Sequence, residues 1–102
     1  MLIVESRNGV PIRLTDERWR HIEERHPELS GQRDRVLETV AEPEVIQEGD
    51  SGELLAVRRY AETPLTEKYL VVPYRELEDD GFVLTAYFTN VVASHRRTLW
   101  KR

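Results

Sequence analysis

The chain has 102 residues, of which 39% are hydrophobic and 33% are charged, with a formal net charge of −4. This length suits one hydrophobic core, and the composition is too apolar for a disordered segment, so we expect a single domain over residues 1–102. Cysteine is absent, which excludes disulfides, thiol nucleophiles and cysteine-based zinc or iron–sulfur sites. The longest apolar run, residues 69–74, is far shorter than the roughly 20 residues that cross a bilayer, so we expect a cytoplasmic protein without membrane contact.

The charge is distributed unevenly along the chain. Residues 96–102 contain four basic residues and no acidic one, so an acidic body carries a basic tail. A protein whose affinity came mainly from phosphate contacts would usually be basic overall, and the net charge therefore disfavours nucleic-acid binding. The tail nevertheless offers Arg96 and Arg97 for phosphates and Trp100 for stacking on a base.

The start of the chain predicts a β-hairpin followed by a helix. Two short apolar stretches, residues 1–4 and 10–14, flank an Asn-Gly dipeptide that favours a type I′ turn. Thr15 can cap a helix that runs to about residue 26, where Pro27 ends it.

Two faces of this helix differ in chemistry. Its apolar face repeats at the helical period and is formed by Trp19, Ile22 and His26. A second face, about 100° round the helix axis, has the same spacing and consists of Arg18, His21 and Arg25. The helix therefore presents an apolar stripe flanked by a stripe of histidine and arginine.

The rest of the chain predicts a second helix and then four strands. The helix begins at Ser30-Gly31, ends before Pro43, and buries Val36, Leu37 and Val40. The hydrophobic period then changes to that of strands, which we expect over residues 45–48, 53–60, 68–74 and 82–89, with a polar loop at 61–67 and a tight turn at 79–81. The order β-β-α-α-β-β-β-β predicts an α+β fold with both helices on one face of an antiparallel sheet.

The alternation of the last strand assigns its two faces. The set predicted to face the helices is Phe82, Leu84, Ala86 and Phe88, and the hydroxyl-rich set predicted to line an open face is Val83, Thr85, Tyr87 and Thr89. The strand at 53–60 contains Arg58 and Arg59, which must point to opposite faces. One of them therefore lies on the open face, and we favour Arg58.

Several motifs together resemble a known superfamily. Residues 21–27 read His-x-x-x-Arg-His-Pro, and Arg58-Arg59-Tyr60, the apolar strand at 69–72 and a Thr-x-Tyr at 85–87 follow in that order. Over roughly residues 12–90 this resembles the phage- and toxin-associated nuclease-like proteins of the barnase, EndoU, colicin and RelE superfamily. The resemblance implies two helices on a curved four-stranded antiparallel sheet, and RNA cleavage that needs neither a metal nor a cofactor. The positions that match the family's site are His21, Arg25, Arg58 or Arg59, Thr85 and Tyr87.

Metal-free RNA cleavage makes definite chemical demands that these residue types can meet. It needs a base for the 2′-hydroxyl, an acid for the leaving 5′-oxygen, and cations for the charged phosphorus centre; histidine suits the first two roles and arginine the third. His21 and Arg25 are one helical turn apart and can act side by side. Thr85 and Tyr87 are expected to hold the phosphate, and the groups expected to bind the RNA around it are Arg59, Arg96, Arg97 and Trp100.

Other interpretations remain open. His21 can be an ordinary surface residue, and Thr85 and Tyr87 fit any half-exposed strand. The chain can then be a catalytically silent relative that binds a protein or a nucleic acid, or an acidic antitoxin- or immunity-like protein that covers a basic toxin. His26 is interpreted as structural, packing with Trp19 at the helix end. Because the first two histidines are five residues apart rather than four, we expect no metal site.

Overall fold

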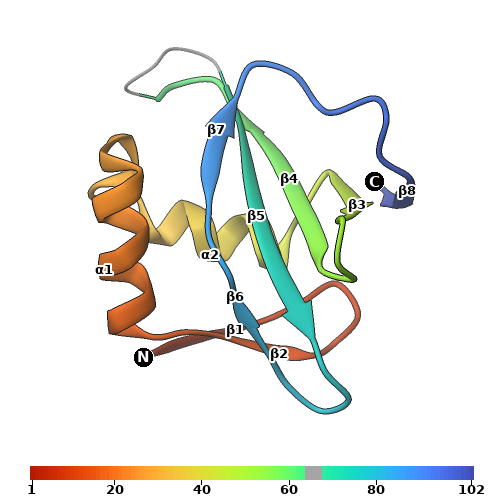
Figure 1. Cartoon of the computed structure of the whole chain (residues 1–102), viewed down its shortest axis with the longest axis horizontal. Helices are drawn as coiled ribbons and strands as arrows, with labels where there is room; N and C mark the ends of the chain where they lie inside the picture. Colours follow the sequence, from red (N-terminus) through yellow and green to blue (C-terminus); the bar gives the residue numbers. More distant parts are fainter. Residues whose placement is uncertain (64–67) are drawn as a thin grey trace.

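The structure is a computed structural model of the chain that describes residues 1–63 and 68–102. Part of the polar loop predicted at 61–67, residues 64–67, lies outside the described residues. The fold is α+β, as predicted (Figure 1). Its elements are β1 (Leu2–Glu5), β2 (Pro11–Leu14), α1 (Asp16–Arg25), the 3₁₀ turn η1 (Pro27–Leu29), α2 (Arg33–Ala41), β3 (Val45–Glu48), β4 (Leu54–Tyr60), β5 (Lys68–Glu76), β6 (Gly81–Val83), β7 (Tyr87–Thr89) and β8 (Thr98–Lys101).

The strands form one mixed sheet with more strands than the four that we predicted. Its order is β1-β2-β6-β5-β4-β3-β8, and β7 follows β6 along the same edge of β5. All pairs are antiparallel except β2 with β6, which is parallel and spans only two residue pairs. α2 crosses behind the sheet and packs on β1, β4 and β5, whereas α1 stands beside β7 (Figure 1). The two helices therefore cover one face and one edge of the sheet.

The N-terminal hairpin and α1 form as predicted. Gly9 takes a φ of +82°, which the hairpin turn requires and which glycine adopts without steric cost. The Thr15 hydroxyl accepts a hydrogen bond from the Arg18 backbone N–H at 3.1 Å and caps the first turn of α1. Trp19 and Ile22 are buried, so the predicted apolar face of the helix is confirmed.

α2 begins three residues later than predicted. Residues 27–29 form η1, and Gly31 takes a φ of +77°, a left-handed conformation that no helix accommodates, so the helix starts only at Arg33. The inner face of α2 (Val36, Leu37 and Val40) is buried as predicted. The main core lies between this face, α1 and the sheet, and its strand residues include Ile12, Leu14, Leu70, Val72 and Tyr74.

The last strand is broken by one extra residue, which reverses part of the predicted face assignment. Tyr74 pairs with Val83 and Val71 pairs with Tyr87, so two residues of β5 face three residues of the partner, 84–86. We call residues 84–86 the bulge. Pro73 opposite the bulge has no N–H to continue the ladder. As a result Val83 is 1% exposed in the core while Phe82 is only partly buried, the reverse of the prediction.

The face predicted to be open is covered. Leu55, Val57 and Val71 form a second apolar cluster on this face, and residues 90–97 pass over it. The Gln47 side chain donates to the Ala93 carbonyl oxygen at 2.7 Å and holds this segment in place. The predicted basic tail is also not a free tail, because Thr98–Lys101 pairs with β3 as β8.

Candidate functional site

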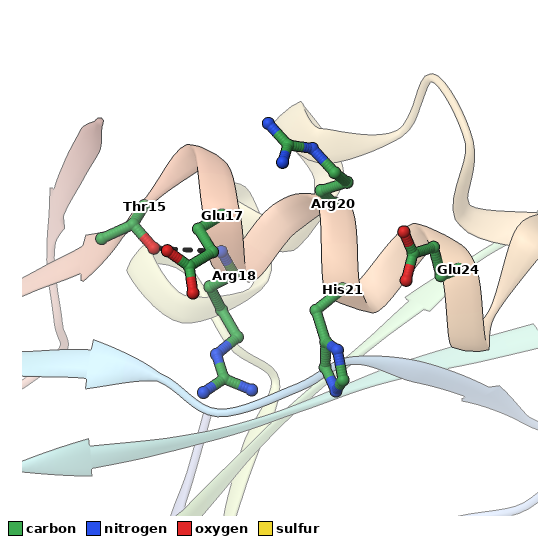
Figure 2. Close-up of a pocket in the computed structure, with 6 residues that line it drawn as sticks. All are labelled: Thr15, Glu17, Arg18, Arg20, His21 and Glu24. Carbon is green, nitrogen blue, oxygen red and sulfur yellow. Dashed lines mark hydrogen bonds between the residues drawn. The ribbon is translucent and has the colours of Figure 1, made fainter.

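A stripe of cationic and imidazole side chains runs along one flank of α1. Arg18, His21 and Arg25 are all exposed, as their helical spacing predicted, and we call them the His21 flank. Arg18 and His21 project from the helix in the same direction (Figure 2). They also line a hollow of about 590 Å³, together with Thr15, Glu17, Arg20 and Glu24. This hollow is open to solvent, so the stripe is accessible to a large ligand.

The two ends of α1 lie near residues 82–87 of the last strand. At the N-terminal end of α1, Arg18 shares a second hollow with Phe82 and Val83. At the C-terminal end, the His26 ring lies 6.3 Å from the Tyr87 ring, measured between centroids. The hollow that His21 lines is formed by residues of α1 and by Thr15, and no residue of 82–87 lines it. We call the region between α1 and residues 82–87 the groove; the bulge, which contains Thr85, lies on its far side.

The side chains of this flank are not used to hold the fold together. Neither His21 nor Arg25 forms a side-chain hydrogen bond or an ion pair with another residue of the described ranges, 1–63 and 68–102. An imidazole and a guanidinium that are exposed and unpaired are available to a ligand. Thr85 and Tyr87 are partly buried, and Tyr87 packs against the second apolar cluster. The hollow that His21 lines includes neither of them.

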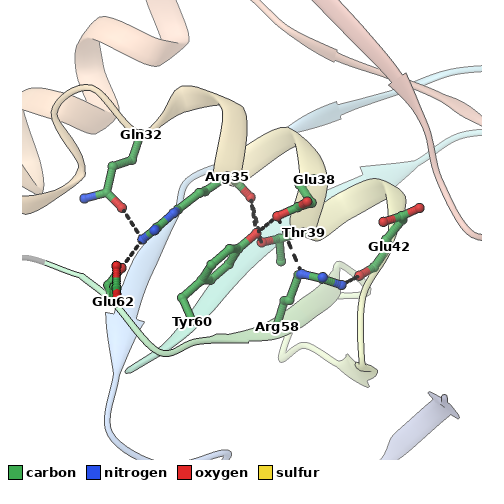
Figure 3. A network of polar contacts seen from close by, with 8 residues as sticks. All are labelled: Gln32, Arg35, Glu38, Thr39, Glu42, Arg58, Tyr60 and Glu62. Carbon is green, nitrogen blue, oxygen red and sulfur yellow. Dashed lines mark hydrogen bonds and ion pairs between the residues drawn. The ribbon is translucent and has the colours of Figure 1, made fainter. Parts of the chain in front are cut away.

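The preference for Arg58 on the open face is wrong. Its guanidinium Nη1 donates to the Glu42 carbonyl oxygen at 2.7 Å, and its Nε lies 3.6 Å from the Glu38 carboxylate (Figure 3). The reason lies in the alternation of β4: Leu54, Ala56 and Tyr60 pack in the main core, and Arg58 shares their face. Arg58 therefore reaches the C-terminal end of α2 and does not join the groove.

Arg58 belongs to a polar network that ties β4 to α2. The Tyr60 hydroxyl donates to the Glu38 carboxylate at 2.5 Å and to the Arg35 carbonyl oxygen at 3.3 Å (Figure 3). Burial, together with the Glu38 carboxylate, raises the pKa of Tyr60 to about 12. The Arg35 guanidinium lies 4.7 Å from the centre of the same ring. These contacts give Arg58 a structural role.

The remaining predicted RNA-binding residues lie away from the groove. Arg59 is exposed on the opposite face of β4 from Arg58. Arg97 is exposed, but Arg96 binds the Asp50 carboxylate with N–O distances of 3.0 and 3.4 Å, which raises the pKa of its guanidinium. The Arg7 guanidinium lies 4.8 Å from the Trp100 ring centre and covers one face of it. β8, which carries Trp100, is separated from β7 by β3, β4 and β5.

His26 was interpreted from the sequence as structural, yet the structure places its ring against Tyr87 at the end of the groove. Its Nδ1 lies 3.8 Å from the Glu28 carboxylate. The approach of Glu28 to His26 has a sequence signal in the dipeptide Pro27-Glu28. A turn that begins at Pro27 brings Glu28 back toward His26. His26 is thus a candidate that the sequence analysis missed.

The described part of the chain shows neither a metal-binding cluster nor a membrane-spanning helix. Within the described ranges, no cluster of three His, Asp or Glu side chains could hold a metal ion, and no helix is long and apolar enough to span a membrane. Comparison with protein-family models, with curated proteins and with solved structures found no match. What the chain does must therefore be inferred from its own residues.

Proposed function

We propose that this protein cleaves RNA without a metal ion, and that the reaction takes place in the groove between α1 and residues 82–87. The observation that carries the proposal is that His21 is exposed, forms no ion pair within the described ranges, and lies between Arg18 and Arg25 on one face of α1. Histidine is the side chain best suited to move protons near neutral pH, and arginine is best suited to hold a phosphate.

The chemistry assigns a role to each wall of the groove. His21 removes the proton from the 2′-hydroxyl, whose oxygen attacks phosphorus to form a 2′,3′-cyclic phosphate, while the bond from phosphorus to the 5′-oxygen breaks. The leaving 5′-oxygen takes up one proton from an acid. Arg18 and Arg25 neutralise the phosphate charge as it develops. The Thr85 hydroxyl donates a hydrogen bond to the same phosphate from the far side of the groove, whereas Tyr87 packs against the second apolar cluster.

RNA fits this site better than DNA does because the internal nucleophile of the reaction is the 2′-hydroxyl, which DNA lacks. The cations of the groove come from α1 itself, so Arg18 takes the phosphate-neutralising role that was predicted for Arg58. Two arginines neutralise few phosphates, and the body around them is acidic. We therefore expect weak general affinity for nucleic acid and only a shallow dependence of binding on salt.

A catalytically silent binding module is the second candidate function. The contacts of Arg58 with Glu38 and Glu42 favour this second function. Because of them, one of the cations expected for catalysis does not lie at the groove. Such a module would use the same His21 flank to bind an anionic partner, whether RNA or an acidic protein segment.

The test is cleavage of single-stranded RNA in the presence of EDTA. We expect His21→Ala to lower the cleavage rate by about 10² to 10⁴, and Arg25→Ala to lower it by about 10 to 100 through lost phosphate stabilisation. The matched controls are His95→Ala, an exposed histidine in the segment over the second cluster, and Arg33→Ala, whose ion pair with Asp16 is largely exposed. Both controls should retain wild-type rates.

The products distinguish this mechanism from contamination and from a silent module. Cleavage should yield 2′,3′-cyclic phosphate and 5′-hydroxyl ends, and a single 2′-deoxy substitution at the cleaved position should abolish it. Binding of RNA that depends on His21 without any cleavage by the wild type would favour the silent module. Wild-type rates in the His21→Ala variant would refute the site.

A further inference from the structure

We propose that two copies of this protein associate through β1, with the two β1 strands antiparallel and Ile3 of one copy opposite Ile3 of the other. This inference is independent of the proposed RNA cleavage. Three observations carry it: the hydrogen-bonding groups left over at the outer edge of β1, the exposed apolar side chains of that strand, and its lack of the features by which proteins block strand addition.

β1 is an end strand of the sheet. Among the strands that the structure describes, it pairs only with β2. It starts near the N-terminus and runs along the rim of the molecule (Figure 1). Val4 packs against the main core, so one face of β1 is covered by the rest of the protein. The outer edge of the strand carries the backbone groups that β2 does not use.

The turn of the hairpin shows which backbone groups β2 does use. The Ser6 N–H donates to the Val10 carbonyl oxygen at 2.8 Å, so this pair is hydrogen-bonded across the hairpin. In an antiparallel ladder, pairs of this kind alternate with pairs that exchange no hydrogen bond. The next hydrogen-bonded pair is therefore Val4 with Ile12, two residues further along each strand.

The residues between the hydrogen-bonded pairs direct their backbone groups the other way. Ile3 lies opposite Arg13 and Glu5 lies opposite Pro11, at positions that exchange no hydrogen bond with β2. Pro11, which has no N–H, fits such a position. The N–H and C=O groups of Ile3 and Glu5 therefore face the free edge, where another strand can pair with them.

The side chains of β1 leave apolar surface exposed at the same edge. Ile3 is 54% exposed on the outer face of the hairpin. Leu2 shares the core face with Val4, yet it is 37% exposed at the end of the described sheet. A strand added along this edge would remove apolar surface from water on both faces of the sheet, which favours association.

The edge at the other end of the sheet is built differently. The pairing of β8 with β3 skips Leu99, which forms a bulge, and β8 ends on Lys101. A bulge and a lysine are two of the means by which proteins keep an edge strand from pairing with another chain. β1 has an unbroken register over Leu2–Glu5 and contains no basic residue and no proline. Strand addition is therefore disfavoured at β8 and unhindered at β1.

A second copy of β1 fits this edge because the strand is apolar on both sides of Ile3. With Ile3 opposite Ile3, each copy donates the Ile3 N–H to the Ile3 carbonyl oxygen of the other, and Leu2 of each copy lies opposite Val4 of the other. The two Glu5 carboxylates then lie at opposite ends of the paired segment. With Val4 opposite Val4, by contrast, Ile3 would face the charged Glu5 of the other copy. The residue pattern therefore favours the register centred on Ile3.

Single-cysteine variants test this register, because the chain contains no cysteine of its own. In the proposed dimer, the Cα atoms of the two Ile3 residues lie about 5.5 Å apart, a distance that a disulfide spans. The two Glu5 residues are four positions out of register and lie more than about 13 Å apart. We expect Ile3→Cys to form a covalent dimer under mild oxidation and Glu5→Cys to remain monomeric. Val91→Cys, at an exposed position outside the strands, measures the background from random collisions.

Ile3→Pro tests the hydrogen bonds at the centre of the interface. It removes the outward N–H of each copy and leaves the pairing with β2 intact, since proline is tolerated where the N–H of an edge strand faces solvent. Sedimentation from about 1 µM to about 1 mM measures the self-association. Because the paired segment is short, we expect the wild type to dimerise only as its concentration rises, and Ile3→Pro to do so about 10 to 100 times more weakly.

Hydrogen exchange of the wild type gives a second measurement that does not depend on how a variant folds. The Ile3 and Glu5 amide protons should exchange more slowly at high protein concentration, because they become hydrogen-bonded in the dimer. The Val4 amide already bonds to β2, so its exchange should change little with concentration.

Three outcomes would overturn the proposal. The wild type could remain monomeric up to about 1 mM, Ile3→Cys could form no more covalent dimer than Val91→Cys, or Glu5→Cys could crosslink as efficiently as Ile3→Cys. Association that Ile3→Pro leaves unchanged but Leu99→Lys abolishes would place the interface at β8 and would also refute it. Concentration-dependent dimers that crosslink at Ile3 and weaken in Ile3→Pro support it.

Discussion

Replacing Tyr74 by phenylalanine should stabilise the protein. Tyr74 is the largest fully buried side chain, and its hydroxyl has no hydrogen-bond partner within the described ranges. Burial, with a smaller contribution from the nearby Glu76 carboxylate, raises the pKa of this phenol well above its usual range. Tyr74→Phe keeps the ring and removes only the unpaired hydroxyl. A buried polar group without a partner costs about 1 to 3 kcal/mol, so we expect a gain of about 1 to 2 kcal/mol.

Tyr60 provides a matched comparison within the same protein. Its hydroxyl donates to the Glu38 carboxylate and to the Arg35 carbonyl oxygen. Tyr60→Phe makes the same chemical change but breaks these bonds, and it should cost about 1 to 2 kcal/mol. The two substitutions should therefore shift stability in opposite directions, although both turn a tyrosine of the sheet into a phenylalanine.

Urea unfolding followed by tryptophan fluorescence measures both effects. For a domain of this size, each kcal/mol moves the thermal midpoint by roughly 4 to 8 °C, so Tyr74→Phe should raise the midpoint of a thermal melt by about 4 to 16 °C and leave the urea m-value unchanged. A Tyr74→Phe variant that is less stable than the wild type would mean that the hydroxyl has a partner in solution. Equal effects from both substitutions would refute the assignment of the network around Tyr60.

Three more predictions follow from the packing and the polar network. A Cβ on Gly81 would lie 2.1 Å from the Arg75 carbonyl oxygen, so Gly81→Ala should cost about 2 kcal/mol or more in urea unfolding. Arg58→Ala removes the contact with Glu38 and should cost about 1 kcal/mol, yet leave RNA cleavage unchanged, which a rate measurement in EDTA can check. Because the pKa of Tyr60 is about 12 when folded against 10.0 for the free phenol, the unfolded chain ionises first. Tyr60 should therefore contribute about 2 kcal/mol to a fall in stability between pH 10 and 12, to which Tyr74 adds, and the fall should be smaller in Tyr60→Phe when both proteins are unfolded in urea across that range.

The sequence predicted most elements because each has a strong local signal. The threonine cap, the helical spacing of Trp19 and Ile22, and the proline that ends α1 all act within a few residues. The bulge has no such local signal. It arises where β5 presents Pro73 to the neighbouring strand, and Pro73 is far from residues 84–86 in the sequence. Alternation read across 82–89 as one strand therefore assigned Phe82 and Val83 to the wrong faces.

The candidate site was predictable in part for the same reason. The exposed stripe of Arg18, His21 and Arg25 follows from helix geometry alone, and the structure confirms it. The side on which Arg58 lies depends on which face of β4 the helices cover, and both faces of that strand are apolar. The pattern of residues 90–97 does not predict that they cover the second apolar cluster. Long-range packing, rather than local propensity, decided each of these points.

The short parallel pairing of β2 with β6 has a consequence for how the molecule folds. Ile12 meets Gly81 and Arg13 meets Phe82, so this junction closes a loop of about two thirds of the chain, and such closure is slow. The antiparallel ribbon of β3, β4 and β5 can assemble first from neighbours in the chain, and the hairpin docks afterwards. α1 begins two residues after β2 ends, so His26 at its C-cap contacts Tyr87 only when that late docking is complete. Amide protons of the hairpin should accordingly exchange through openings that also dismantle the groove.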